Sequence, residues 1–292
     1  MNTQWPPVYD QTYFPAPDEP YWNRSVETMD PGERQERVIL PKLRAQLAYA
    51  YEHSPFYRKK WDQAGINPGD IRSLEDFEKV PCVTKEEIRR DQAEYPPFGS
   101  NLCVPRKELA RVQGTSGTTG KPTAFGISRG DMARIAEAHA RIMWGFGVRQ
   151  EDIVFIGSFF SLYWGSWGAL LGAERLGATA FPFGAGVPGQ TERGIEWMKE
   201  VKPTVFYGTP SYSLYLAEKA RAMGMDPRKD FNFRILIFSG EPGAGVPSTK
   251  KRIEDTYGGI CIDSGSTAEM TPWMANGECA HRRGMHFWQD IV

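Results

Sequence analysis

A run of nine residues, rich in glycine and in hydroxyl side chains, lies between a strand-like segment and a segment typical of an amphipathic helix. Its three glycines allow the positive φ angles and close backbone approach that an anion-binding loop needs. Its four hydroxyls and one lysine add hydrogen-bond donors and positive charge. The run consists of Gly114, Thr115, Ser116, Gly117, Thr118, Thr119, Gly120, Lys121 and Pro122. This composition predicts a loop that binds polyphosphate, and the alternative is a merely flexible loop.

The run departs from the P-loop of Walker type. That motif has glycine five places before its Gly-Lys pair and Ser or Thr after it, whereas this chain has Thr115 and Pro122 at those places. Pro122 lacks an N–H group and fits poorly into the first turns of a helix. We therefore expect a strand or hairpin over residues 123–127 and a helix from Asp131.

Polar or glycine-rich segments follow three further strand-like runs. Residues 208–211, 239–242 and 263–269 come directly after short apolar stretches. In an open parallel sheet, ligands bind beyond the carboxyl ends of the strands. We therefore expect these three segments to converge on one cleft.

The elements that must position these residues alternate between strand and helix from about residue 108 onward. Short apolar strands separated by amphipathic helices imply crossover connections and a mostly parallel sheet. The expected strands are 153–156, 179–181, 204–207, 235–238 and 259–262, and the expected helices are 131–146, 166–177, 191–200, 211–223 and 248–256. The predicted fold class is α/β, with mostly parallel sheets flanked by helices.

The first hundred residues have a different pattern. Residues 1–30 are rich in proline and aromatic residues, so they are expected to pack as an extended arm or to stay loose. Residues 31–100 are predicted to be helical because leucines recur there at helical spacing. We therefore expect an N-terminal arm and helical segment over residues 1–107 and an α/β ligand-binding region over residues 108–292.

The run from Thr115 to Pro122 resembles the phosphate loop of the adenylate-forming enzymes, the superfamily of acyl-CoA synthetases, luciferases and peptide-synthetase adenylation domains. Other segments are similar to one branch of it, the phenylacetate-CoA ligases. These segments are residues 34–57, 71–77, 84–89, 239–242 and 278–290. The resemblance covers nearly the whole chain.

The resemblance implies a role for each candidate residue. Thr115, Ser116, Gly117, Thr118, Thr119, Gly120 and Lys121 would hold the β- and γ-phosphates of ATP, with Lys121 as a catalytic residue. Ser239, Gly240, Glu241 and Pro242 would lie against the adenine. Asp263, Ser264, Gly265, Ser266 and Thr267 would line the adenine edge and the α-phosphate. Glu269 would act as a catalytic carboxylate that holds Mg²⁺, because Mg²⁺ takes one or two carboxylates plus phosphate oxygens; the alternative is a solvated loop carboxylate.

The segment from Asp263 to Glu269 departs from the family pattern Asp-x-Tyr-Gly-x-(Ser/Thr)-Glu. Gly265 replaces the tyrosine, Ser266 replaces the glycine, and Ala268 replaces the serine or threonine. Altered nucleotide affinity and a pseudoenzyme are therefore alternatives to an ordinary active site.

Family members continue into a ribose-binding aspartate, a hinge and a small mobile domain with a catalytic lysine, whereas this sequence stops at Val292. The resemblance therefore implies an incomplete or split enzyme. Its C-terminal domain would be absent or would come from a separate polypeptide.

An aromatic cluster over residues 159–167 follows the expected strand at 153–156. Glycine and serine between its large rings favour the wall of an acyl pocket, and burial in the core is the alternative. A flat aromatic acid would gain offset-stacking contacts there, so the expected substrate is an aryl or arylalkyl carboxylic acid. The candidate pocket residues are Phe160, Tyr163, Trp164, Gly208, Thr209 and Pro210.

The histidines and cysteines that could suggest a metal or catalytic site have simpler structural interpretations. Cys279, His281 and His286 suggest zinc, with Cys261 as a further ligand, but scattered ligands without a CxxC pair favour structural thiols and a surface histidine. His139 lies on the apolar stripe of the helix expected at 131–146, so we expect it in the core.

Composition narrows the class of protein. A formal net charge of −1 over 292 residues offers no basic field for nucleic acid, and no apolar run reaches membrane-spanning length. Four widely spaced cysteines and the absence of a signal-like N-terminus indicate a reducing compartment, so the cytoplasm is the expected location.

The predicted function follows from the resemblance. A carboxylic acid and ATP, with Mg²⁺, would give an acyl-adenylate, and CoA would then form the thioester, as in phenylacetate-CoA ligases. The alternatives are a ligase that adenylylates a cofactor hydroxyl and a truncated nucleotide-binding protein without turnover. The expected partners are the acid, ATP and CoA, and a homodimer is left open.

Overall fold

The computed structural model describes residues 5–115, 122–162, 164–185, 189–267, 269, 276–279, 282 and 284–291. The chain divides into two compact units, of which the first comprises Met1–Asp10 and Arg24–Arg134 and the second comprises Gln11–Asn23 and Ile135–Val292. This division falls at Arg134, inside a helix. The boundary expected between residues 107 and 108 from the change of sequence pattern stays a prediction.

The first unit is helical up to residue 94, as its leucine spacing predicts. Its helices are α1 (Arg24–Glu27), α2 (Pro31–Arg34), α3 (Leu40–His53), α4 (Pro55–Gln63), α5 (Leu74–Phe77) and α6 (Lys85–Glu94), with a π-helical segment at Gln35–Ile39 and 3₁₀ turns at Pro68–Asp70 and Arg106–Glu108. Leu47, Ala50, Trp61 and Ile71 form its buried apolar cluster. Hydroxyl caps begin three of the helices, because Ser54 accepts from Tyr57 N, Ser73 accepts from Asp76 N, and Thr84 forms a reciprocal capping box with Glu87.

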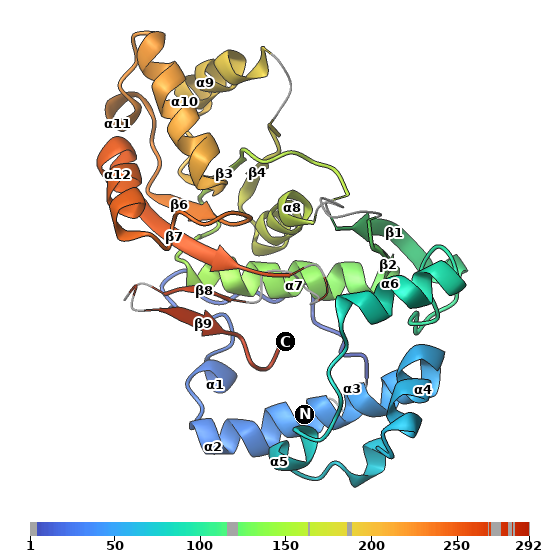
Figure 1. Ribbon diagram of the computed structural model, residues 1–292. Coiled ribbons are helices and arrows are strands. Elements are labelled where there is room, and N and C mark those ends of the chain that lie inside the picture. Colours follow the sequence, from blue (N-terminus) through green and yellow to red (C-terminus); the bar gives the residue numbers. More distant parts are fainter. Residues whose placement is uncertain are drawn as a thin grey trace. The chain divides into compact units, whose positions relative to one another are not determined.

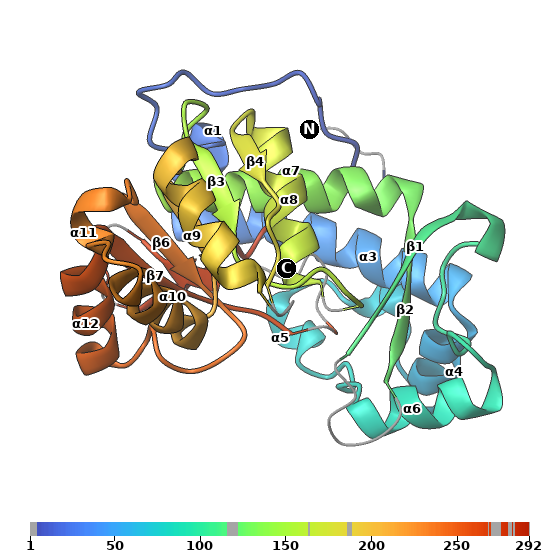
Figure 2. The same cartoon turned by 90° about the horizontal axis from the view of Figure 1, so that it is seen from above.

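An antiparallel hairpin lies beside α6 in the same unit (Figure 2). Strand β1 (Leu109–Gly114) pairs with β2 (Ala124–Ser128), with Gly114 opposite Ala124. The predicted hairpin at 123–127 is therefore confirmed to within a residue. The following helix begins at Arg129 because Ser128 and Asp131 cap each other: Ser128 N donates to Asp131 Oδ2 (2.9 Å), and Asp131 N donates to Ser128 Oγ (3.1 Å).

The described part of the second unit contains a seven-stranded sheet with the order β4-β3-β5-β6-β7-β8-β9 (Figure 1). Its strands are β3 (Ile153–Ile156), β4 (Thr179–Phe181), β5 (Val205–Gly208), β6 (Ile235–Phe238), β7 (Ile260–Gly265), β8 (Asn276–Glu278) and β9 (Met285–Phe287). The first five are parallel, whereas β8 and β9 pair antiparallel. The predicted α/β fold with a mostly parallel sheet is confirmed.

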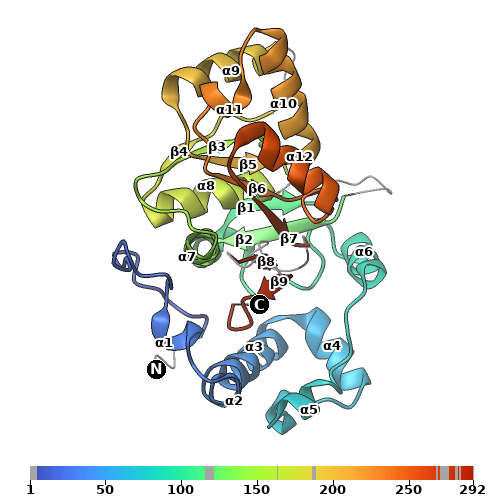
Figure 3. The same ribbon diagram turned by 90° about the vertical axis from the view of Figure 1, so that its left-hand side faces the viewer.

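Helices cover both faces of this sheet (Figure 3). The helices are α7 (Arg129–Gly145), α8 (Gly165–Leu176), α9 (Gln190–Val201), α10 (Pro210–Ala222), α11 (Pro227–Asp230) and α12 (Pro247–Tyr257). Strand side chains alternate between the faces, so Ile235 and Ile237 join the cluster with α7 and α8, while Leu236 and Phe238 join the cluster with α9, α10 and α12. His139 is 1% exposed in α7, as expected for a core residue.

Residues 11–23 pack against α7 and α8 of the second unit. Trp22 is 2% exposed, and its Nε1 donates to Glu137 Oε1 at 2.7 Å. Glu137 also pairs with Arg175 at 2.8 Å, and the Arg175 guanidinium lies 5.2 Å from the ring centre of Phe14. This part of the expected arm is therefore packed rather than loose. None of the described helices has both the length and the hydropathy that crossing a bilayer requires.

Candidate functional site

Three of the predicted ligand-binding segments follow the neighbouring strands β5, β6 and β7, and hydrogen bonds join them. Ser239 N donates to Gly208 O at 3.1 Å. Ser211 N donates to Glu241 Oε1 at 2.6 Å, and Ser264 Oγ donates to Phe238 O at 2.8 Å. The structure therefore brings these segments together at the carboxyl edge of the parallel strands, where ligands of open α/β sheets bind.

The order of the strands places a topological switch point at β3 and β5. The chain leaves β3 for β4 on one side and returns to β5 on the other side. Gly157, just after β3, donates its N–H to Tyr207 O at 2.8 Å. Of the candidate pocket residues, Gly208 ends β5, Thr209 follows it and Pro210 begins α10, next to this switch point.

The start of α10 organises this edge. Thr209 caps the helix because its Oγ1 accepts from Tyr212 N at 3.3 Å, and Pro210 occupies the first turn. The Glu241 carboxylate accepts from the next N–H, that of Ser211. A negative charge at a helix N-terminus is favourable. Glu241 therefore fixes the turn after β6 to the start of α10.

The aromatic cluster after β3 contains rings of different burial. Trp164 is only 3% exposed, whereas Phe160 is partly buried and makes an edge contact with Trp167 at 4.9 Å between ring centres. The carbonyl of Ser161 accepts from Trp167 Nε1 at 2.8 Å. Tyr163 lies outside the described residues. The burial of Trp164 supports the core alternative for that ring, and the pocket role of Phe160 stays a prediction.

Asp263 at the end of β7 lies in a partly buried, charged environment. Its backbone N donates to Glu278 Oε2 at 2.9 Å, and Glu278 in turn pairs closely with Lys250. Burial, followed by the negative charge of Glu278, raises the pKa of Asp263, and Lys250 opposes this rise. A Cβ atom at Gly245 would lie 2.6 Å from Asp263 Oδ2, so only glycine lets the loop after β6 approach this carboxylate.

Gly265 stands where the family pattern has tyrosine, and the structure gives a local reason. Gly265 pairs with Asn276 across β7 and β8, and a Cβ atom at Gly265 would lie 2.5 Å from Asn276 Oδ1. The Asn276 amide thus occupies the space into which a side chain at 265 would extend. Ser266 and Thr267 follow as exposed residues, and Glu269 is exposed in a turn.

The described end of the predicted phosphate loop shows how the loop is closed. Thr115 N donates to Thr123 O at 3.1 Å, and Thr123 N donates to Thr115 Oγ1 at 3.1 Å. The Thr115 hydroxyl is therefore used in a hydrogen bond between the two residues that flank the predicted loop. The rest of the predicted phosphate-binding set, residues 116–121 with Lys121, lies outside the described residues.

The structure shows the positions of three of the four residues considered as zinc ligands. His286 Nε2 lies 3.1 Å from Cys279 Sγ, whereas Cys261 is buried in the cluster against α12, and His281 lies outside the described residues. Over the described part of the chain, no group of three or more His, Cys, Asp and Glu side chains could hold a metal ion.

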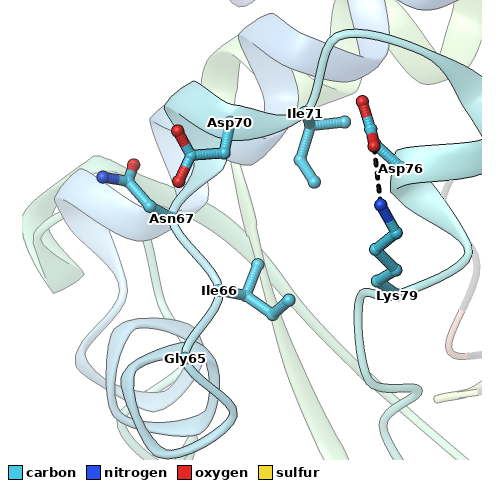
Figure 4. A pocket seen from close by; sticks show the side chains of 7 residues that line it. All are labelled: Gly65, Ile66, Asn67, Asp70, Ile71, Asp76 and Lys79. Atoms are coloured by element: carbon cyan, nitrogen blue, oxygen red, sulfur yellow. Dashed lines mark hydrogen bonds and ion pairs between the residues drawn. The ribbon is translucent and has the colours of Figure 1, made fainter.

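A separate cavity of about 180 Å³ lies in the first unit (Figure 4). Its polar side chains serve local structure. Asn67 accepts from Gly69 N at 2.9 Å, and Asp76 pairs with Lys79 at 2.8 Å. The bond from Lys79 is the largest cause that lowers the pKa of Asp76 to about 2. These carboxylates and amides are used as caps and ion pairs, so the cavity does not add to the candidate site.

Sequence reasoning missed the residues that surround Asp263. Lys250 and Asn276 belong to no motif, and Glu278 was noted only within a family-like segment. The alternation of β8 is a signal that could have found two of them. A Cβ atom at Gly277 would lie 2.3 Å from the Phe146 ring, so Gly277 faces α7, and Asn276 and Glu278 must face the opposite side.

The candidate site thus lies at the carboxyl ends of the parallel strands, and comparison with known proteins assigns the class of protein. The family model of AMP-binding enzymes matches residues 53–288, so the chain belongs to the AMP-binding enzyme family. The phenylacetate-coenzyme A ligase of Escherichia coli (strain K12) is 35% identical over 268 residues, which cover 91% of this chain and 58% of that protein. The phenylacetate-coenzyme A ligase of Aromatoleum evansii is 36% identical over 277 residues, which cover 91% of this chain and 60% of that protein.

A solved structure is more similar still. The 2-hydroxyisobutyryl-CoA ligase in complex with 2-HIB-AMP and CoA in the thioesterification state is 53% identical, with a TM-score of 0.94, and the match covers 98% of this chain and 60% of that one. The resemblance to phenylacetate-CoA ligases seen in the sequence is confirmed by these relatives. The chain spans roughly 60% of their length.

Proposed function

We propose that this chain carries the nucleotide- and acyl-binding parts of an AMP-forming acid–CoA ligase. The observation that carries the proposal is the 53% identity with a CoA ligase over 98% of the chain. In the proposed reaction, a carboxylate oxygen of the acid attacks the α-phosphorus of ATP and pyrophosphate leaves. The sulfur of CoA then attacks the acyl carbon, and AMP leaves as the thioester forms.

The family resemblance assigns each of these residues a part of this work. Residues 239–242 would contact the adenine, and residues 263–267 its edge and the α-phosphate. Thr115 to Lys121 would hold the β- and γ-phosphates. Backbone N–H groups, hydroxyls and one lysine are donors that would stabilise the charge that develops on the leaving pyrophosphate.

Glu269 would hold Mg²⁺. Its exposure in a turn after β7 fits a hydrated ion that takes one carboxylate together with phosphate oxygens and waters. When bound, the ion would supply positive charge beside the phosphates.

The relatives support two classes of acid. The similarity to phenylacetate-CoA ligases favours the aryl or arylalkyl acid predicted from the sequence. The higher identity with 2-hydroxyisobutyryl-CoA ligase favours a small branched 2-hydroxy acid as a second candidate.

Pyrophosphate release tests both the reaction and the acid. The chain is incubated with ATP, Mg²⁺ and phenylacetate, benzoate, 2-hydroxyisobutyrate or hexanoate, and pyrophosphate is followed with and without CoA. Release that depends on one acid class assigns the substrate class. ATP binding without release for any acid would instead support a nucleotide-binding protein without turnover or a ligase for a cofactor hydroxyl.

The location and assembly remain part of the proposal. None of the four cysteines, which all lie in the described part of the chain, forms a disulfide. This supports a reducing compartment such as the cytoplasm. A homodimer and a separate polypeptide that supplies further catalytic parts are tested by the mass of the complex in solution.

A further inference from the structure

A compact set of charged groups lies beside Asp263, on the face of the sheet that packs against α12. Glu278 on β8 and Lys250 on α12 have side chains that are 10% and 16% exposed, and they form a close ion pair. A nearly buried ion pair is costly to desolvate and is weak evidence for a role in stability alone. Its position at the exit of β7 suggests a further purpose.

Glu278 connects three elements through one oxygen. Its Oε2 accepts from Lys250 Nζ on α12 and from Asp263 N on β7, the second at 2.9 Å. Asp263 lies within β7, two residues before the strand ends at Gly265. The position of its backbone therefore depends on a side chain from the next strand.

The Asp263 carboxyl points into the same region. Gly245, in the loop that follows β6, lies so close that an added Cβ atom would be 2.6 Å from Asp263 Oδ2. The loop begins with Ser239 to Pro242, the segment proposed to contact the adenine. Asp263 therefore lies beside both the ion pair and the loop that carries the proposed base-binding turn.

The ionisable groups that face Asp263 come from every element packed against it. β8 contributes Glu278, α12 contributes Lys250, and β7 contributes Cys261, whose other acidic neighbour is Glu254 of α12. Burial raises the pKa of the Cys261 thiol to about 12, so this group stays neutral. Glu254 is bonded to Cys261 N at 3.0 Å and pairs with Arg282. The balance at Asp263 is thus set by one anion, Glu278, and one cation, Lys250.

We propose that Glu278 is a positioning residue for the nucleotide site: its Oε2 holds the backbone of Asp263, while Lys250 offsets the charge of Glu278 so that the Asp263 carboxylate can stay charged and accept a hydrogen bond from the nucleobase. The proposal rests on the proposed function, because it assumes that this edge binds ATP. The donor would be an exocyclic amine, which pairs well with a carboxylate.

Two single variants test the charge balance because they act in opposite directions. Lys250→Met removes the cation that lowers the pKa of Asp263, so ATP affinity falls at higher pH than in the wild type. Glu278→Gln keeps an oxygen for Asp263 N and removes the anion that raises this pKa, so affinity persists to lower pH. Isothermal titration of ATP between pH 4 and 8 should show the midpoints of the two variants displaced in opposite directions from that of the wild type.

Two further variants separate positioning from general damage. Lys250→Met with Glu278→Gln removes both charges together, and its midpoint should return to the wild-type value. Lys251→Met is the matched control, since Lys251 lies on the same helix, is 75% exposed and pairs with Asp255. The ATP phosphates titrate identically in every experiment, so differences between variants report on the protein.

The outcomes distinguish the two levels of the argument. Opposite displacements with recovery in the double variant support the inferred coupling of Glu278 and Lys250 to the Asp263 carboxylate. Displacement in the same direction, or none, with ATP still bound, would overturn the inference and leave the proposed function standing. Failure of the wild-type chain to bind ATP at any pH in this range would overturn both.

Discussion

Lys121 carries the one positive charge in the run from Gly114 to Pro122. A charge-assisted hydrogen bond to phosphate contributes about 1.5–3 kcal/mol. Lys121→Ala should therefore weaken ATP binding by roughly tenfold to a hundredfold, with little change in the melting temperature. Calorimetric titration with ATP and Mg²⁺ measures the affinity. Equal affinities for the variant and the wild type would remove this lysine from the site.

We expect the charged Asp263 carboxylate to favour ATP binding and to lower the stability of the fold. Its raised pKa means that the folded chain holds this proton more tightly than the unfolded chain. Stability therefore falls as pH rises from the ordinary pKa of an aspartate through the raised one. Asp263→Asn should lack this contribution, keep or increase the melting temperature at pH 8, and bind ATP about tenfold more weakly because a neutral amide is a poorer acceptor.

The control for Asp263→Asn is Asp255→Asn on α12, because Asp255 is exposed and pairs with Lys251. Melting temperatures of both variants and the wild type are compared from pH 3 to pH 8. If the difference in melting temperature between Asp263→Asn and the wild type does not change with pH, the surroundings of Asp263 do not raise its pKa.

At the scale of elements, one side chain ties the loop-bearing hairpin to a helix. Gln92 on α6 is 8% exposed, its Nε2 donates to Ala124 O at 2.7 Å, and its Oε1 accepts from Ala124 N at 3.2 Å. Gln92→Leu keeps the volume but leaves two backbone groups without partners, which costs about 1–3 kcal/mol. Hydrogen exchange of the Ala124 amide should become faster, whereas Gln63→Leu, at the exposed end of α4, should not change it.

Residues 11–23 and helices α7 and α8 are held together by a buried ion pair. Arg175→Met should destabilise the chain by about 3 kcal/mol, because it leaves the Glu137 carboxylate buried without its cation. Adding Glu137→Gln should recover much of this loss, since the amide oxygen can still accept from Trp22 Nε1. Urea unfolding monitored by tryptophan fluorescence measures both. A double variant as unstable as the single one would show that packing of the Arg175 stem, not charge, is responsible.

For the whole molecule, the prediction concerns which acid binds at the carboxyl ends of the parallel strands. If Phe160 lines the acyl pocket, Phe160→Ala should change the ratio of kcat/KM for phenylacetate over hexanoate by about tenfold, the value of one missing ring contact. Trp164→Ala should instead lower stability by about 3–5 kcal/mol, because this ring is 3% exposed. A wild-type ratio in Phe160→Ala would assign that ring to the core.

The whole fold could be predicted to a large extent because its signals are local. Strands such as 235–238 are short apolar runs, and the helices between them have apolar stripes, so type and order follow from pattern alone. The boundaries differ by a few residues where caps decide them, as with Ser128 and Asp131 at the start of α7. Polar segments after β5, β6 and β7 were expected to meet, since parallel strands end at one edge.

The sequence by itself determined the class of fold, the family and the segments that follow each strand, because these depend on spacing along the chain. Tertiary structure decided which groups surround Asp263. Lys250, Glu278 and Gly245 are distant from it in sequence, and only the pairing of β7 with β8 and the packing of α12 bring them together. The same pairing places Asn276 over Gly265. Charge balance and close approach depend on distances in space, and spacing along the chain does not encode them.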